Sequence, residues 1–337
     1  TLAREAGDPG GALALHAEEE QAYAKVGDPS GVATSISNQA LARHALGDPA
    51  GAAALLARAE VILRDLDLPA ALQTTVGNKA AFLLQAGDLA GAEAALAEQE
   101  AICNRTANRQ GLAACLGNQG LLALQRGDLA TAGTKLAEQE RITREVGDRR
   151  GTAAALGNLV TVAVQANDPT GALRHLDAQL VEARALGPDG ADLVVTNLTV
   201  QQRMRPALGD VAGLAALATS VEADARAALA TSAPGPTAAP ARTPTEQVLA
   251  QVLALRGTMA LGTGDVAGAE ALLAEADELA RRAANPHAQQ LAAGNLGLLA
   301  LQRGDLARAE ALLVAQEEVS RRASIPEGLS AALGNLA

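Results

Sequence analysis

The sequence predicts an all-α protein of the α-solenoid class, in which pairs of helices stack side by side. Two observations carry this prediction. The chain repeats itself every 40 residues: Gly-Asp recurs at 47–48, 87–88 and 127–128, and Asn167-Asp168 keeps the interval. Ala and Leu, both strong helix formers, dominate the composition, and Tyr23 and Phe82 are the only aromatic residues. A fixed period of this length is typical of an array in which each repeat buries its apolar face against its neighbours.

The helices follow from the pattern within one repeat, residues 109–146. Apolar and small side chains recur once per helical turn from Leu112 to Ala123 and again from Leu129 to Thr143. This spacing predicts two amphipathic helices of about 16–18 residues joined by short turns. Glycine ends a helix readily because it adopts a left-handed conformation, and the Asp that follows can cap the next helix. Proline at 9, 29, 49 and 169 suits a first helical position.

The repeats divide the chain into two blocks and a connecting segment. An amino-terminal block at 1–230 holds a partial repeat at 1–26, regular repeats at 27–66, 67–106, 107–146 and 147–186, and an irregular one at 187–230, where Pro206 should kink or break its first helix. Residues 231–244 are rich in Pro, Ala and Thr and are expected to form an exposed loop. A carboxy-terminal block at 245–337 holds two regular repeats and a truncated one. We expect stacking to continue past the loop, with a hinge as the alternative.

Small residues and leucines recur at the positions that mark a tetratricopeptide repeat. A small residue lies in the middle of each first helix, an alanine lies early in each second helix, and a leucine follows four residues later. The positions are Ala40, Ala80, Gly120, Gly257 and Gly297; Ala12, Ala52, Ala92, Ala132, Ala172, Ala269 and Ala309; and Leu56, Leu96, Leu136, Leu176, Leu273 and Leu313. The chain thus resembles the long, 40–42-residue repeats of kinesin light chains, the LGN/Pins adaptors and bacterial signalling proteins. The resemblance implies a right-handed superhelix that binds a protein or peptide in its concave groove.

Charge and hydropathy exclude several other classes of protein. The formal net charge of −11 is spread along the chain without a block of like charges, which argues against nucleic acid and an anionic membrane surface as partners. There is no signal peptide and no apolar run long enough to cross a bilayer. Cys103 and Cys115 are expected as free thiols on apolar helix faces, with a disulfide as the alternative. We expect a cytoplasmic segment of a longer, bacterial protein, because the chain starts without Met, ends within a helical pattern and uses few lysines.

No catalytic or metal-binding signature occurs in the sequence. Neither a phosphate-binding GxxxxGK[ST] loop nor an HExxH motif is found, and the four histidines lack the spacing of metal ligands. We therefore expect no enzyme activity in this segment, no cofactor and no metal.

An asparagine recurs once per repeat, two residues before the small residue of the first helix. The series comprises Asn38, Asn78, Asn118, Asn158, Asn197 and Asn295, continues at Asn335 and is broken by Leu255. Asparagine is a mediocre helix former, so its repeated place in mid-helix needs a reason. In the families that the chain resembles, asparagines here clamp the backbone of an extended peptide; the alternative is that they bond within the repeats. Glycines 77, 117, 157 and 294 precede an asparagine and would let a ligand approach. Glutamines on the same face are further candidates: Gln85, Gln125, Gln165 and Gln302.

The function predicted from the sequence is a protein- or peptide-binding scaffold or sensor. Two alternatives remain open. The array could serve as an oligomerisation or structural scaffold, forming a homo-oligomer whose groove is filled by the chain itself or by a second copy. It could also regulate an enzyme, such as a signalling ATPase or a protease, whose catalytic domain lies outside this segment.

Overall fold

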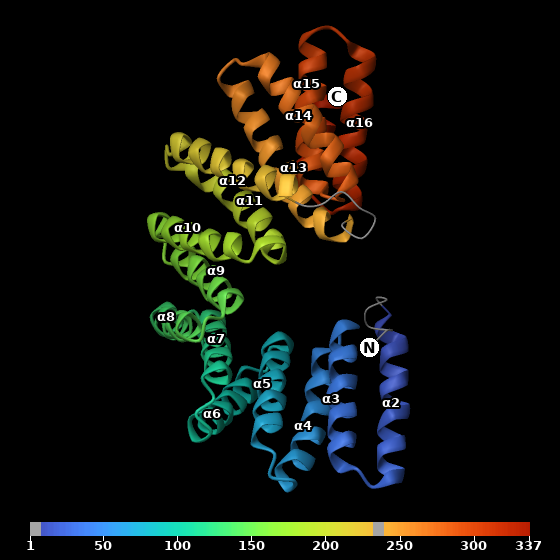
Figure 1. Ribbon diagram of the computed structural model, residues 1–337, viewed down its shortest axis with the longest axis vertical. Coiled ribbons are helices and arrows are strands. Elements are labelled where there is room, and N and C mark those ends of the chain that lie inside the picture. Colours follow the sequence, from blue (N-terminus) through green and yellow to red (C-terminus); the bar gives the residue numbers. More distant parts are fainter. Residues whose placement is uncertain (1–7, 232–238) are drawn as a thin grey trace. The chain divides into compact units, whose positions relative to one another are not determined.

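The computed structural model describes residues 8–231 and 239–337, and these residues fold into helices joined by short turns, with no strand among them (Figure 1). The chain divides into two compact units, which we call the N-terminal unit (Thr1–Asp168) and the C-terminal unit (Pro169–Ala337). The prediction of an all-α solenoid is confirmed. The division falls between two repeats of the block that the sequence marks as 1–230.

The N-terminal unit consists of eight described helices, which alternate between the second and first helix of successive repeats. They are α2 (Pro9–Val26), α3 (Pro29–Ala45), α4 (Pro49–Asp65), α5 (Pro69–Ala86), α6 (Leu89–Arg105), α7 (Arg109–Gln125), α8 (Leu129–Glu145) and α9 (Arg149–Gln165). Each packs against the next along the chain, as α2, α3 and α4 show in Figure 1. We call α3, α5, α7 and α9 the A helices and α2, α4, α6 and α8 the B helices.

The C-terminal unit continues the same alternation, with one short insertion. Its elements are α10 (Pro169–Ala185), the 3-10 helix η1 (Gly187–Gly190), α11 (Ala191–Ala207), α12 (Val211–Thr231), α13 (Ala239–Gly262), α14 (Val266–Arg282), α15 (Pro286–Gln302), α16 (Leu306–Arg322) and α17 (Pro326–Leu336). Here α11, α13, α15 and α17 are the A helices, and α10, α12, α14 and α16 are the B helices. Pro206 does not break α11 but lies one residue before its end, where the helix stops anyway.

The turns between helices work as the sequence predicts. Gly127, for example, has φ of +74°, and the Asp128 side chain that follows accepts a hydrogen bond from the backbone N–H of Thr131. This bond satisfies one of the amide groups that lack a partner in the first turn of a helix. Five turns place a residue other than glycine in the left-handed conformation instead: Asp67, Ala107, Asn167, Ala284 and Ser324.

The core is built from the small residues and leucines of the repeat. A β-carbon on Gly120 would stand 2.6 Å from Cγ of Leu136, and Gly257 and Gly297 bear the same relation to Leu273 and Leu313. Leu136 and Ala132 are fully buried. The small residue thus lets the A and B helices of a repeat approach closely, and the leucine fills the space between them.

Two details differ from the sequence or refine it. The expected loop at 231–244 is shorter, because Thr231 ends α12 and α13 begins at Ala239; residues 232–238 lie outside the described residues. A helix can begin in this proline-containing stretch because the N–H groups of a first turn have no intrahelical partner to lose. Cys103 and Cys115 are buried and free, as expected, and burial raises the pKa of the Cys115 thiol to about 12.

Candidate functional site

The asparagines of the N-terminal unit lie on one face of its four A helices. Residues at i, i+4, i+7 and i+11 share a face of an α-helix. We call the sixteen residues at these places the asparagine stripe, and all of them are exposed or half-buried. Its members are Thr34, Asn38, Leu41 and Ala45 on α3; Thr74, Asn78, Ala81 and Gln85 on α5; Ala114, Asn118, Leu121 and Gln125 on α7; and Ala154, Asn158, Thr161 and Gln165 on α9.

The four asparagines of the stripe are half-buried, and their side-chain amides make no hydrogen bond to residues 8–231 or 239–337. They occupy the same place on four successive A helices, 40 residues apart in the sequence. Each amide can donate and accept a hydrogen bond. The stripe therefore carries one amide group per repeat that is available to a ligand.

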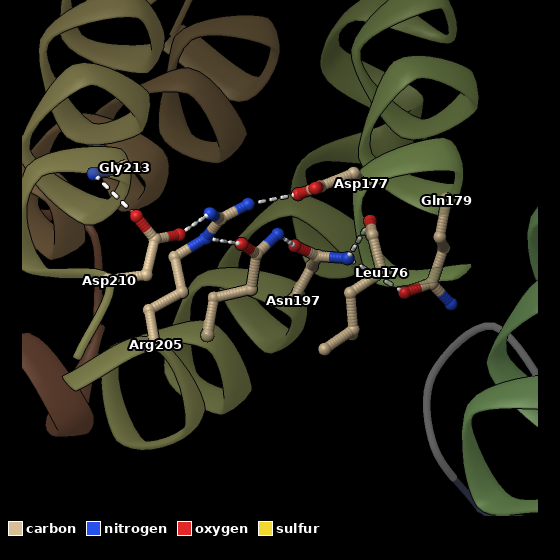
Figure 2. Close-up of polar contacts among 8 residues, drawn as sticks. Leu176, Asp177, Gln179, Asn197, Arg205, Asp210 and Gly213 are labelled. Atoms are coloured by element: carbon tan, nitrogen blue, oxygen red, sulfur yellow. Dashed lines mark hydrogen bonds and ion pairs between the residues drawn. The ribbon is translucent and has the colours of Figure 1, made fainter. Parts of the chain in front are cut away.

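Asn197, the fifth member of the series, has a different environment in the C-terminal unit. Its side chain is 1% exposed. Nδ2 donates to the backbone oxygen of Leu176 at 2.8 Å and to Oε1 of Gln179 at 2.9 Å, while Oδ1 accepts from Nε2 of Gln201 at 2.8 Å (Figure 2). Both ends of this amide are thus occupied by contacts that join α11 to α10 and to its own next turn.

The bonds of Asn197 continue into an ionic cluster, which Figure 2 shows. Nε of Arg205 donates to Oε1 of Gln201, and its guanidinium pairs with Asp177 of α10 and Asp210, the residue that precedes α12. Burial acts to lower the pKa of Arg205, but the hydrogen bonds to the two aspartates outweigh it and hold the pKa above its ordinary value. The cluster joins three helices of the irregular repeat around Asn197.

The remaining candidates divide in the same way. Asn295 donates from Nδ2 to Oγ1 of Thr258 at 2.8 Å, which links α15 to α13. Oε1 of Gln85 lies 2.6 Å from Nε2 of His44, whose ring stacks on Phe82 with the ring centroids 4.4 Å apart. Gln85 therefore takes part in the contact between α3 and α5. Three glutamines, Gln125, Gln165 and Gln302, are exposed near the ends of α7, α9 and α15.

The glycines that precede the asparagines accommodate a side chain of the same repeat rather than the ligand that the sequence suggested. A β-carbon on Gly77 would stand 2.3 Å from Nε2 of Gln99 on α6, and the corresponding distances are 2.7 Å for Gly117 and Gln139 and 2.5 Å for Gly294 and Gln316. The three glutamines are buried. Each glycine is thus needed because a glutamine amide lies against the helix at that point.

A regular pairing in the sequence accompanies these contacts, and it was missed in the sequence analysis. Gly157 and Gln179 also stand 22 residues apart, like the three pairs above. Repeats without the glycine have alanine at the second place: Ser37 with Ala59, Thr196 with Ala218, and Ala254 with Ala276. These alanines are fully buried. The offset of 22 residues, compared across repeats, was the signal that could have revealed the contact.

Other kinds of site are not seen in the described part of the chain. Residues 8–231 and 239–337 contain no group of three or more His, Cys, Asp or Glu side chains placed to hold a metal ion. Within the same residues, no helix has the length and apolar character needed to cross a membrane.

The paired helices, the close contacts of small residues with leucines and the capped turns define an α-solenoid of the tetratricopeptide type. No family model matches the sequence, and no curated protein matches it. Among solved structures, BtubC (BKLC) from P. vanneervenii is similar, with a TM-score of 0.54 and 18% sequence identity, over 68% of this chain and 94% of BtubC. This similarity supports the fold alone.

Two further solved structures match with lower TM-scores. A tetratricopeptide repeat protein from Parabacteroides merdae matches with a TM-score of 0.30 and 15% identity, over 83% of this chain and 98% of that protein. The tetratricopeptide domain of P58(IPK) matches with a TM-score of 0.22 and 14% identity, over 96% of this chain and 98% of that domain.

Proposed function

We propose that the chain is a protein-interaction scaffold, and that the asparagine stripe holds an extended peptide segment of a partner. A primary amide offers donor hydrogens on one side and an acceptor oxygen on the other, which matches the N–H and C=O of a peptide group. Contacts of this kind bind the backbone of a peptide and leave its side chains unread. The partner would be recognised first as an extended chain.

The observation that carries the proposal is the contrast between two environments of one residue type. Asn38, Asn78, Asn118 and Asn158 present their amides on an accessible face of successive helices. The amide of Asn197, by contrast, is buried and bonded to α10 and to Gln201. If every asparagine served the packing of the repeats, the first four should be bonded as Asn197 is.

The experiment first selects ligands from a phage-displayed library of random twelve-residue peptides, panned on the full chain. Synthetic copies of the selected peptides are then titrated calorimetrically against the wild type, Asn118→Ala and Asn158→Ala. Each substitution removes an amide that pairs with a ligand group, so it should weaken binding by about 1–3 kcal/mol. The melting temperature of both variants should stay close to that of the wild type.

Asn197→Ala is the matched control. It leaves the backbone oxygen of Leu176 and the amide of Gln201 without their partner in a buried place, so it should lower the free energy of unfolding by about 1–3 kcal/mol. Peptide affinity should not change. The proposal is wrong if no peptide is selected, or if Asn118→Ala and Asn158→Ala behave like Asn197→Ala, with lower stability and unchanged affinity.

A further inference from the structure

Charged residues are unevenly divided between the two kinds of helix in the N-terminal unit. The four A helices contain five residues of the types Asp, Glu, Lys and Arg, whereas the four B helices, of equal total length, contain eighteen. None of the five is acidic. The A helices are therefore almost free of charge in a protein whose net charge is −11.

None of the five charged residues belongs to the asparagine stripe. Arg43 pairs with Asp48 at 2.9 Å, Lys79 pairs with Glu60 of α4, and Arg109 pairs with Glu145 of α8. Arg149 and Arg150 begin α9, and both are engaged with other residues. All sixteen residues of the stripe are uncharged, and their polar atoms belong to amides and hydroxyls.

We propose that the partner segment is uncharged at the residues that face the stripe; this rests on the proposed function. A charged side chain pressed against the stripe would lose water and gain no opposite charge, which is costly. Amides and hydroxyls can instead satisfy the peptide backbone and neutral polar side chains. Successive side chains of an extended strand point to opposite sides, so the requirement applies to every second residue of the bound segment.

The panning experiment tests the inference when it is performed at 50 mM NaCl, a condition that favours charged ligands. The selected peptides should contain Asp, Glu, Lys and Arg at most at alternate positions over the stretch that binds. Their dissociation constants should change by less than about twofold between 50 and 500 mM NaCl, because no ion pair forms with the stripe. Enrichment of charged residues at consecutive positions, or a tenfold loss of affinity in high salt, would overturn the inference.

A pair of variants places a charge on the stripe and off it. Ala114 lies on the stripe and Ala94 on the B helix α6, and both are exposed. Ala114→Glu should weaken the selected peptides by about tenfold, because the new carboxylate loses water on binding, while Ala94→Glu should leave affinity unchanged. Equal effects of the two variants would also overturn the inference.

The outcomes separate this inference from the function on which it rests. If the selected peptides are charged and salt-sensitive but Asn118→Ala still weakens them, the inference fails and the peptide-binding function stands. If Asn118→Ala and Asn158→Ala leave affinity unchanged, the proposed function fails whatever the charge of the peptides.

Discussion

The side-chain amide of Gln139 lies against Gly117, so close that a β-carbon on the glycine would stand 2.7 Å from Nε2. Gly117→Ala should therefore displace a buried side chain that has little room to move. We expect the free energy of unfolding to fall by about 1–3 kcal/mol, the usual cost of overpacking, as measured by urea denaturation.

Two further variants give the matched comparison. Gly133→Ala adds the same methyl group in α8, where its nearest neighbour is Cγ1 of Val162 at 3.8 Å, so it should stabilise by about 0.5–1 kcal/mol through the better helix propensity of alanine. Adding Gln139→Ala should relieve the clash, making the effect of Gly117→Ala smaller than in the wild type. Additive effects of the two substitutions would show that the contact is not what requires glycine.

Ala132 fills the contact between the A and B helices of its repeat and is 0% exposed. Ala132→Leu should destabilise the protein by about 1–3 kcal/mol, because three more carbons cannot fit without moving the backbone. Thermal melting checks this. Ala137→Leu, at an exposed place on the same helix, should change stability by less than about 0.5 kcal/mol. An unchanged melting temperature for Ala132→Leu would show that the site can relax.

Ala107 has φ of +52° in the turn between α6 and α7, where most repeats have glycine. The left-handed conformation costs an L-residue with a β-carbon about 1 kcal/mol, so Ala107→Gly should stabilise by about that amount. Ala94→Gly, in the exposed middle of α6, should destabilise by about 1 kcal/mol. Destabilisation by both variants would mean that residue 107 is not strained in solution.

Glu222 predicts a pH dependence of stability. Burial acts to raise the pKa of this carboxyl, but its hydrogen bonds with Arg226 and Arg256 outweigh burial and lower the pKa from its ordinary value of 4.5. A lowered pKa in the folded state stabilises the protein above pH 4.5, and that stabilisation is lost as the pH falls below it. Glu222→Gln should cost about 1–3 kcal/mol at pH 7 and less at pH 3.5, as measured by urea denaturation. Glu278→Gln, at an exposed side chain, should show a small effect at both pH values; a constant cost for Glu222→Gln would contradict the prediction.

The sequence predicted those parts of the fold that depend on local chemistry. Gly127 and Asp128 end one helix and cap the next through groups within four residues of each other, and the contact of Ala132 and Leu136 with the preceding helix recurs at a fixed interval. The start of α13 was not predicted, because its first residues have the composition of a loop.

The candidate site was predicted less completely, because spacing alone cannot distinguish one asparagine from another. Asn118 and Asn197 hold the same place in their repeats. What separates them is Arg205, which reaches Asp177 and Asp210 and holds Gln201 beside Asn197. This cluster joins three helices, and no single segment of sequence contains it.

The pairing of Gly77 with Gln99 constrains how such a chain can be recombined. Both partners lie within one repeat, on α5 and α6, so duplication of whole 40-residue segments keeps each pair together. A crossover in the turn between the two helices separates them: glycine then meets alanine and leaves a void, or serine meets glutamine and clashes. Genetic exchange and engineered grafting should therefore succeed when the junction falls between repeats, at turns such as Gly147-Asp148, and fail when it falls inside one.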